Sequence, residues 1–398
     1  MRVAVVSGSR ADYGLLRPTI TALRDDPRFE LELLVTAMHL EEEHGLTVTE
    51  IEADGYDFTR VPIDGQTSNH GDFGRRIGRA TVSFTDVLTE CGAEIVLVLG
   101  DRFEVLATAL AATALGLPIA HIHGGELSEG SLDDATRHCV TKLAHYHFVA
   151  TRAYGERVCQ LGEQPWRVHV VGAAAIESIR ELDLLDSDAL MPRLGLNALE
   201  TPLIALTLHP VSLEPELAGT QARIVTAAVD EVLDGHGTVV LTLPNDDPGS
   251  RSTRAELLGW SEASERVHAF ASLGQHRYLS LLSNADAVVG NSSSAIIEAP
   301  SFRVPVVNIG ARQRGRIMAR NVLSCPPARD EIVRTLRQAL DPGFRASLAD
   351  LMSPYGDGDV SRRILDVLAA TSRLQVRDKQ FYDLPDGSWR ASLEFGKR

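Results

Sequence analysis

The sequence predicts an α/β protein made of two Rossmann-like, doubly wound domains that face each other across a central cleft. Apolar, β-branched runs of strand length alternate with helical patterns through both halves of the chain. The clearest unit is residues 94–123, where two such runs, 94–100 and 117–123, flank an Ala/Leu-rich helix. A βαβ unit of this kind implies parallel strands, and 398 residues are enough for two cores.

The first half alternates strand and helix from its start. A strand at 2–7, a helix at 14–25 and a strand at 30–36 precede a Gly-containing loop near 64–74 and a helix at 73–90. After the βαβ unit come a helix at 133–145, a strand at 147–150, a helix at 152–161 and a strand at 168–171. We expect these elements to form one domain, residues 1–178.

A second alternating series follows a polar, acid-rich connector at 181–201. Strands are predicted at 202–207, 238–243, 267–271, 287–290 and 304–308, and helices at 221–234, 254–265, 275–283, 293–299 and 330–340. We expect these elements to form a second domain, residues 179–359. The last segment, residues 360–398, reads as a helix at 360–371 and a charged tail, and we expect it to pack back on the first domain.

Composition limits the class of partner and the compartment. The net charge of −15, with no basic tract to offset it, argues against nucleic acid as a partner. No apolar run is long enough to span a membrane, and a strand beginning at residue 2 leaves no room for a signal peptide. The four cysteines (Cys91, Cys139, Cys159 and Cys325) lack paired or metal-type spacing, which favours a reduced cytoplasm and no structural zinc.

Ionisable side chains follow both strands of the βαβ unit. Asp101 comes after the first strand, and His123 and Glu126 come after the second. Open α/β sheets bind ligands beyond the carboxyl ends of their strands, and acids and histidines gathered there suit proton transfer. For any one of these residues a solvated loop charge is the alternative, but the cluster favours a site.

The helix that follows contains the segment DDATRH. Asp133 and Arg137, and likewise Asp134 and His138, are four residues apart and share one helix face. An ordinary surface ion pair explains this spacing. Because the segment follows HIHGGE so closely, the same residues could instead orient a carboxylate into the cleft.

Two turns between a strand and a helix look suited to an anion. The segment SGSRADYG places Arg10 beside a small-residue turn, although it lacks dinucleotide spacing and an ordinary turn capped by Asp12 explains it as well. In GNSSSAIIEAP, Asn291, Ser292, Ser293 and Ser294 supply more donors than helix capping requires. They favour a diphosphate, and Glu298 one turn later suits hydrogen bonds from a sugar diol.

Two further residues of the second half are candidates for binding phosphate. Arg312 lies with Arg314 and Arg316 in a Gly-punctuated loop after a strand, where a cation cluster in an acidic protein fits a phosphate ester. His209, in LTLHPVS, ends a strand and precedes a proline, so it is a candidate acid, base or phosphate contact. A solvated loop and a structural histidine are the respective alternatives.

These segments together, in this order, resemble the hydrolysing branch of the UDP-N-acetylglucosamine 2-epimerase family. The matching motifs are SGSRADYG, GDRFE, HIHGGE, DDATRH with TKLAH, LHP, GNSSS with EAP, and NIG with RQ and GR. They span residues 7 to 316, which is most of the chain. Arg102, Glu104 and Glu126 favour the hydrolysing branch, because the other branch is typified by threonine after the GD dipeptide and by a differently charged second loop.

The resemblance implies a GT-B-like architecture and a UDP-sugar bound between its domains. It implies that a UDP-2-acetamido sugar and water become UDP and the free sugar inverted at C2, by elimination to a glycal followed by hydration. For UDP-GlcNAc the product is N-acetylmannosamine, the precursor of sialic acid. No metal or other cofactor is needed, and relatives form homodimers or homotetramers.

Crowded carboxylates in a desolvated cleft raise one another's pKa, which a base for a weakly acidic C2 proton requires. We predict that Asp101 is a catalytic carboxylate, that Glu126 and Asp133 share base and hydration roles, and that His209 acts near the leaving phosphate. The predicted substrate-binding residues are Arg10, His123, Asp134, Arg137, Asn291, Ser292, Ser293, Ser294, Glu298 and Arg312.

Alternatives stay open at this point. Family members can carry glutamate at the position of His123. Three interpretations follow: His123 performs the role of that glutamate, Glu126 performs it instead, or the chain acts on another sugar such as a UDP-2,4-diacetamido-trideoxyhexose. A non-hydrolysing epimerase, a retaining GT-B glycosyltransferase and a nucleotide-sugar-binding regulator are the other readings. The intact acid residues argue against the regulator.

Overall fold

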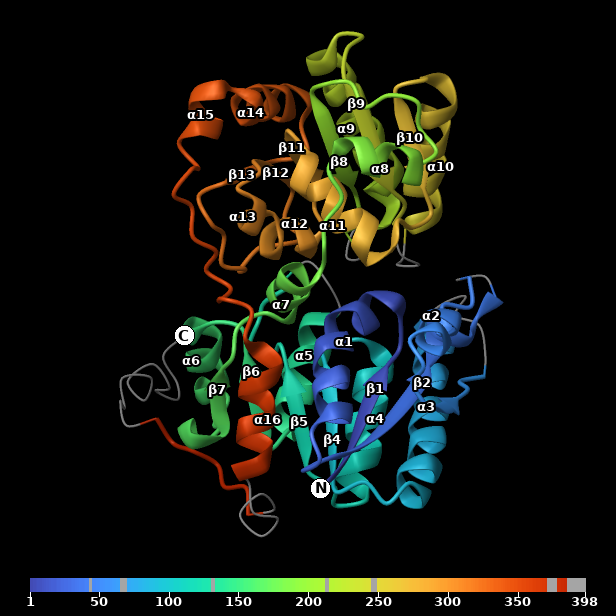
Figure 1. Cartoon of the computed structure of the whole chain (residues 1–398), viewed down its shortest axis with the longest axis vertical. Helices are drawn as coiled ribbons and strands as arrows, with labels where there is room; N and C mark the ends of the chain where they lie inside the picture. Colours follow the sequence, from blue (N-terminus) through green and yellow to red (C-terminus); the bar gives the residue numbers. More distant parts are fainter. Residues whose placement is uncertain are drawn as a thin grey trace, which may run out of the picture.

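A computed structural model describes residues 1–42, 45–64, 70–129, 133–211, 215–244, 249–370 and 378–384. The chain forms two lobes, one above the other in Figure 1, and each lobe is built on one parallel sheet. The prediction of an α/β protein with two Rossmann-like domains is therefore confirmed. Among the described residues, no helix has both the length and the apolar character that crossing a bilayer requires.

The sheet of the first lobe has the strand order β3-β2-β1-β4-β5-β6-β7. Its strands are β1 (Arg2–Ser7), β2 (Glu30–Thr36), β3 (Thr59–Val61), β4 (Ile95–Leu99), β5 (Ile119–Ile122), β6 (Tyr146–Val149) and β7 (Val168–Val170). Its helices are α1 (Arg10–Asp25), α2 (Val48–Ala53), α3 (His70–Glu90), α4 (Phe103–Ala114), α5 (Asp133–Leu143), α6 (Arg152–Gln160) and α7 (Ala174–Glu181). The order reverses between β1 and β4, where such sheets place their ligands.

Alternation along the strands fills a core on each face of this sheet. On β1, Val3 and Val5 enter an apolar cluster with α1, whereas Ala4 and Val6 enter a second cluster with α3 and α4. Both faces are buried because parallel strands need a helical cover on each side. The carboxyl ends of the strands are thereby left as the open edge of the lobe.

The sheet of the second lobe has the strand order β10-β9-β8-β11-β12-β13. Its strands are β8 (Leu203–Thr207), β9 (Thr238–Thr242), β10 (Val267–Phe270), β11 (Ala287–Gly290), β12 (Val306–Ile309) and β13 (Val322–Cys325). Its helices are α8 (Ser187–Arg193), α9 (Ala218–Leu233), α10 (Ser250–Ala263), α11 (Gly274–Asn284), α12 (Ser293–Ile297), α13 (Ala299–Phe302), α14 (Arg329–Leu340) and α15 (Pro342–Ala346).

The chain returns to the first lobe at its end. Helix α16 (Val360–Ala370) lies beside the first lobe in Figure 1 and contributes Ile364 and Leu368 to the cluster around β1. Farther on, the Lys379 ammonium donates to the carbonyls of Lys142 and Ala144, at 2.5 and 2.6 Å. The rest of the predicted tail lies outside the described residues, and the domain boundaries at 178 and 359 stay predictions.

The structure corrects the prediction at three places. Helix α1 begins at Arg10 rather than at residue 14, because Ser9 caps it by accepting the N–H of Asp12 at 3.3 Å. Residues 181–201 are not a plain connector: they contain α8, whose Leu190 is buried in the second lobe despite the acidic surroundings. Strands β3 and β13 were not predicted, because short edge strands carry little periodicity.

Candidate functional site

The predicted site residues gather at the carboxyl edges of the two sheets. In the first lobe they follow the neighbouring strands β1, β4 and β5, and in the second lobe they follow β8, β11 and β12, which are also neighbours. The turn after β5 is strained, because His123 has a φ of 66°, in the left-handed region that L side chains rarely adopt. Such strain at a sheet edge is typical of a functional turn.

Asp101 is held by an arginine from the next helix. The buried Arg137 guanidinium, on α5, forms an ion pair with Asp101 Oδ2 and donates to the carbonyl of His123 at 2.9 Å. Arg137 therefore fixes the turn after β4 to the turn after β5. The Asp101 side chain keeps 17% of its surface exposed, which leaves it accessible to a ligand.

Glu126 is the most enclosed carboxylate of the cluster. One oxygen, Oε1, lies 2.6 Å from Nδ1 of His123. The other, Oε2, forms an ion pair with Arg316 from the second lobe and lies 3.8 Å from Arg137. Burial raises the pKa of this group, but the two arginines and the histidine outweigh burial and hold the pKa well below its usual range.

The hydrogen bonds assign the tautomer of His123. The backbone N–H of Ala174, at the start of α7, donates to Nε2 of His123 at 3.2 Å. Nε2 is therefore the acceptor, and Nδ1 carries the hydrogen that is donated to Glu126. Because both ring nitrogens are engaged, His123 links Glu126 to α7 rather than presenting a free base.

Asp133 and Asp134 occupy the first turn of α5. Asp134 accepts the backbone N–H of Ser128 at 2.5 Å and lies 3.6 Å from Nε2 of His138. The predicted pairing of Asp134 with His138 is thus present, and it also ties the loop after β5 to the helix. Asp133 is half-buried and interacts with the charge of Arg102.

A second charged group lies at the ends of β1 and β4. Arg102 Nε is 2.6 Å from the buried carboxylate of Glu104 and 3.9 Å from Asp12. Burial and the charge of Glu104 raise the pKa of Asp12 to about 6, against the opposing effect of Arg102. Arg10, predicted to contact an anion, lies 3.5 Å from Glu50. The prediction did not include this group as a unit, although GDRFE and SGSRADYG supply its members.

In the second lobe, Asn291 clamps the strand β8 to β11. The backbone N–H of His209 donates to Asn291 Oδ1, and Asn291 Nδ2 donates back to the carbonyl of His209, both at 2.8 Å. Gly290 permits this close approach: its φ is 140°, and a Cβ there would lie 1.9 Å from the carbonyl oxygen of Thr207. One part of the polar GNSSS segment is therefore structural.

The serines of that segment have different roles. Ser292 caps α12 by accepting the N–H of Ser294 at 3.4 Å. The Ser294 hydroxyl is hydrogen-bonded to the hydroxyl of Tyr278, and Ser293 is half-buried at the helix start. Behind them, burial raises the pKa of Glu298 to about 7, so this carboxyl is poised to change charge near neutrality.

Several polar groups of this half gather around Asn291 or are buried without a partner. Arg312 and Gln313 donate to the carbonyl of Asn291, at 3.4 and 2.8 Å. Within the described part of the chain, Nδ1 of His209, Oε2 of Glu298 and Oε1 of Gln313 are buried and have no hydrogen-bond partner. Burial and the charge of Arg312 lower the pKa of His209 to about 3, so it is neutral at pH 7. Native proteins rarely leave such atoms unsatisfied.

The two half-sites touch directly. Arg316, in the loop after β12, reaches Glu126 and also donates to the Ser128 hydroxyl at 3.2 Å. The sequence analysis named Arg316 with Arg312 and Arg314 as a phosphate-binding cluster, but only Arg312 was among the predicted substrate-binding residues. Three arginines in one loop were visible in the sequence, but which of them crosses to the other lobe depends on how the lobes meet.

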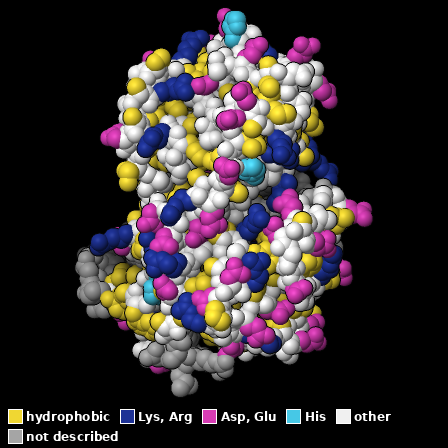
Figure 2. All heavy atoms as spheres, in the orientation of Figure 1, with side chains coloured by type: hydrophobic (Ala, Val, Ile, Leu, Met, Phe, Trp, Pro, Cys, Tyr) yellow, Lys and Arg dark blue, Asp and Glu magenta, His cyan; other side chains and the backbone are white. Residues whose placement is uncertain are grey.

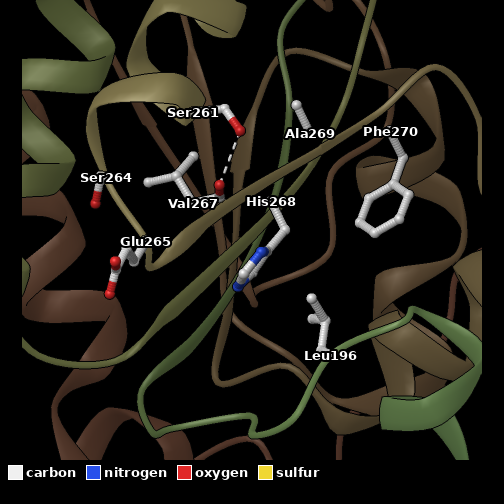
Figure 3. A pocket seen from close by; sticks show the side chains of 8 residues that line it. All are labelled: Leu196, Ser261, Ser264, Glu265, Val267, His268, Ala269 and Phe270. Carbon is white, nitrogen blue, oxygen red and sulfur yellow. Dashed lines mark hydrogen bonds between the residues drawn. The ribbon is translucent and has the colours of Figure 1, made fainter.

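Two surface hollows lie away from the predicted residues. One, of about 450 Å³, lies at the outer strand β10, where the Ser261 hydroxyl donates to the carbonyl of Val267 at 2.8 Å (Figure 3). The other, of about 630 Å³, is lined by residues of α1, α7 and α16. Neither contains a predicted site residue.

Sequence comparison finds similar proteins over most of this chain. The sequence model of the UDP-N-acetylglucosamine 2-epimerase family matches residues 21–369. The chain is 35% identical over 369 residues to UDP-N,N'-diacetylbacillosamine 2-epimerase (hydrolyzing) of Legionella pneumophila, which covers 92% of this chain and 95% of that protein. It is 31% identical over 391 residues to UDP-N-acetylglucosamine 2-epimerase of Neisseria meningitidis, with 96% and 99% covered.

A solved structure shares the fold. The crystal structure of UDP-GlcNAc 2-epimerase from Neisseria meningitidis bound to UDP-GlcNAc superposes with a TM-score of 0.76 at 19% sequence identity. The match covers 93% of this chain and 100% of that chain. The chain therefore shares the fold of that protein over both lobes.

Proposed function

Because the chain belongs to the UDP-N-acetylglucosamine 2-epimerase family, we propose that it is a hydrolysing 2-epimerase of UDP-2-acetamido sugars. Its reaction would convert the UDP-sugar and water into UDP and the free sugar inverted at C2. One observation carries the proposal. The Arg316–Glu126 ion pair joins the paired carboxylates of the first lobe to the loop that also holds Gln313, one of the buried and unpartnered groups of the described second lobe, and this supports a nucleotide half beside an acid/base half.

The second lobe would hold the nucleotide. Glu298 has an unoccupied buried oxygen suited to a ribose diol, and the start of α12 with Arg312 suits the diphosphate. His209 is neutral, and its buried, unpartnered Nδ1 would hydrogen-bond an oxygen of the leaving phosphate. These groups would stabilise the negative charge that grows on UDP as its bond to C1 breaks.

The first lobe would exchange protons at C2. A base removes the C2 proton, the electron pair forms the double bond between C1 and C2, and UDP leaves from C1. Water then adds its hydroxyl to C1 while C2 is protonated from the opposite face, which inverts it. We assign these two steps to Asp101, whose side chain is partly exposed, and to Asp133, while Glu126 is nearly fully buried between His123 and Arg316.

The sugar is UDP-GlcNAc in our first proposal, and the product is then N-acetylmannosamine, a precursor of sialic acid. A second candidate, UDP-N,N'-diacetylbacillosamine, is favoured by the 35% identity to the Legionella pneumophila enzyme named for it. We further propose a cytoplasmic homodimer or homotetramer, as the sequence predicts. No metal or other cofactor takes part in the reaction as proposed.

The test is a direct assay with each sugar nucleotide. Purified protein is incubated separately with UDP-GlcNAc and with UDP-N,N'-diacetylbacillosamine, and free UDP and free sugar are measured together. We expect equimolar UDP and C2-inverted free sugar from at least one of them. A C2-inverted sugar still bound to UDP would identify a non-hydrolysing epimerase instead, and UDP binding without turnover of either would identify a regulator.

A further inference from the structure

The loop between β12 and β13 touches both half-sites. At one end, Gln313 donates to the carbonyl of Asn291, in the proposed nucleotide half. Three residues later, Arg316 reaches Glu126 and Ser128, in the acid/base half. Three residues of backbone, at most about 11 Å, separate these contacts, because consecutive Cα atoms are about 3.8 Å apart. The loop therefore joins the two half-sites over a short length of chain.

The Arg316 end of this loop is fixed by buried contacts across the lobes. The N–H of Ile317 donates to the Tyr154 hydroxyl at 3.1 Å, and the Tyr355 hydroxyl donates to the Ile317 carbonyl at 2.6 Å. Gly315, with a φ of 86°, lies so close to Leu127 that a Cβ there would be 2.7 Å from its Cδ1. Arg316 therefore projects from a turn that these contacts hold in place.

The charges around Glu126 make this arginine important. Glu126 exposes 1% of its side chain and Arg316 exposes 5%. The other groups that face Glu126 are His123, Arg137 and the hydroxyl of Tyr355. A buried carboxylate that loses one of its cations is left with an uncompensated charge, which is costly. Separation of the lobes would impose that loss, since Arg316 belongs to one lobe and Glu126 to the other.

We propose that Arg316 is an interdomain latch, a positioning residue that completes the Glu126 cluster only when the two lobes are closed. Closure, favoured by a nucleotide in the second lobe, then sets the geometry of the turn that carries His123 and Glu126. The latch acts through Glu126 and need not touch the sugar. Its role in turnover rests on the proposed function, whereas its role in holding the lobes does not.

The first test needs no substrate. Thermal melting is followed as a function of pH for the wild type, Arg316→Gln and Arg316→Lys, with Arg314→Gln as the matched control because Arg314 is an exposed arginine of the same loop. In the wild type the pKa of Glu126 is lowered, so its stabilising contribution is present above the usual value of 4.5 and is lost only as pH falls through the lowered value.

Without Arg316, burial dominates and the pKa of Glu126 rises. The ionised group then destabilises the protein as pH increases, so the loss of Tm in Arg316→Gln should widen between about pH 5 and about pH 8. The Tm of Arg316→Lys should lie between those of Arg316→Gln and the wild type, because lysine keeps the positive charge. Adding Glu126→Gln to Arg316→Gln should restore part of the Tm at about pH 8, since the unpaired buried carboxylate is then neutral and Arg137 keeps Asp101 as its partner.

The second test uses turnover. In Arg316→Gln the acid limb of kcat/KM should move upward by about one pH unit or more, while UDP affinity stays within about three-fold of the wild type. Parallel pH profiles for Arg316→Gln and Arg314→Gln, in melting and in turnover, would overturn the latch. Should no UDP-sugar be turned over by the wild type, the proposed function fails while the melting result still decides the latch.

Discussion

The two half-sites differ in how they treat their polar groups. In the first lobe the carboxylates are paired internally: Asp101 with Arg137, and Glu126 with His123 and Arg316. In the second lobe, within the residues that the structure describes, buried atoms of His209, Glu298 and Gln313 have no partner. Among the described residues, Asp101 and Glu126 of the first half therefore have charged partners within the protein, whereas Glu298 Oε2 and His209 Nδ1 of the second are buried without a hydrogen-bond partner.

This difference matches the two tasks of the proposed reaction. Proton transfer needs carboxylates fixed in position and in charge, which internal ion pairs provide. Nucleotide binding needs donors and acceptors that are not already satisfied. Over the face shown in Figure 2, acidic and basic side chains are interspersed on both lobes, so the local groups rather than a broad surface charge distinguish the halves. Substitutions should therefore separate into kcat effects and affinity effects.

The largest effect is expected at Asp101. Asp101→Asn keeps the shape but removes the proton acceptor, so kcat should fall by about a thousand-fold. UDP affinity, measured by calorimetry, should change by less than about three-fold, because the nucleotide half is intact. Asp86→Asn, at an exposed aspartate of α3, is the control. If Asp101→Asn kept about a third of the wild-type activity, Asp101 would not be a proton acceptor in the reaction, and the proposed division into a catalytic half and a binding half would be contradicted.

At His209 the effect should fall on affinity. His209→Ala removes the side chain whose free Nδ1 is proposed to meet the leaving phosphate. We expect UDP affinity to drop by about ten- to a hundred-fold, as for a hydrogen bond to a charged group. His268→Ala, on the outer strand β10, serves as the control. An unchanged affinity for UDP would show that this histidine does not face the nucleotide.

Glu298 should make nucleotide binding depend on pH. Burial raises its pKa to about 7, and a carboxylate that accepts ribose hydroxyls binds best when ionised. Affinity for UDP should therefore rise from about pH 6 to about pH 8, by at most about ten-fold per unit. Glu298→Gln cannot titrate, so comparing it with the wild type cancels the titration of UDP itself. Equal slopes for the two proteins would contradict this role.

The smallest effect is expected at Asp134. This carboxylate fixes the loop after β5 through the N–H of Ser128 and does not belong to the proposed proton-exchange pair. Asp134→Asn should lower kcat by a few-fold, about the effect of weakening one local hydrogen bond, and leave UDP affinity unchanged. A loss of kcat as large as that of Asp101→Asn would move Asp134 into the catalytic pair.

Much of the fold was predictable because its strands are buried on both faces. A continuous apolar run such as the one at β4 predicts a buried strand, and the alternation of such runs with helical patterns predicts a parallel sheet. The misses occur where local composition opposes burial: α8 lies in an acid-rich stretch, yet Leu190 anchors it in the core. Composition describes the exposed face of such a helix better than its buried face.

The site was predictable residue by residue but not as a set of contacts. Asp101, Glu126, His209 and Asn291 each follow a strand, and topology alone brings them to an edge. That Asn291 clamps the backbone of His209 follows from the pairing of β8 with β11. The choice of Arg316 over its neighbours for Glu126 depends on how the lobes meet, which no local pattern encodes.

Incubation with UDP-GlcNAc in heavy water tests the central claim most directly. The account predicts that each free N-acetylmannosamine molecule, identified by NMR, carries one deuterium at C2 and appears together with one UDP, since C2 loses its proton and regains one from solvent. The same experiment on UDP-N,N'-diacetylbacillosamine covers the second candidate sugar. Release of a free sugar that keeps its original C2 hydrogen and configuration would contradict the account, because it would show hydrolysis without proton exchange.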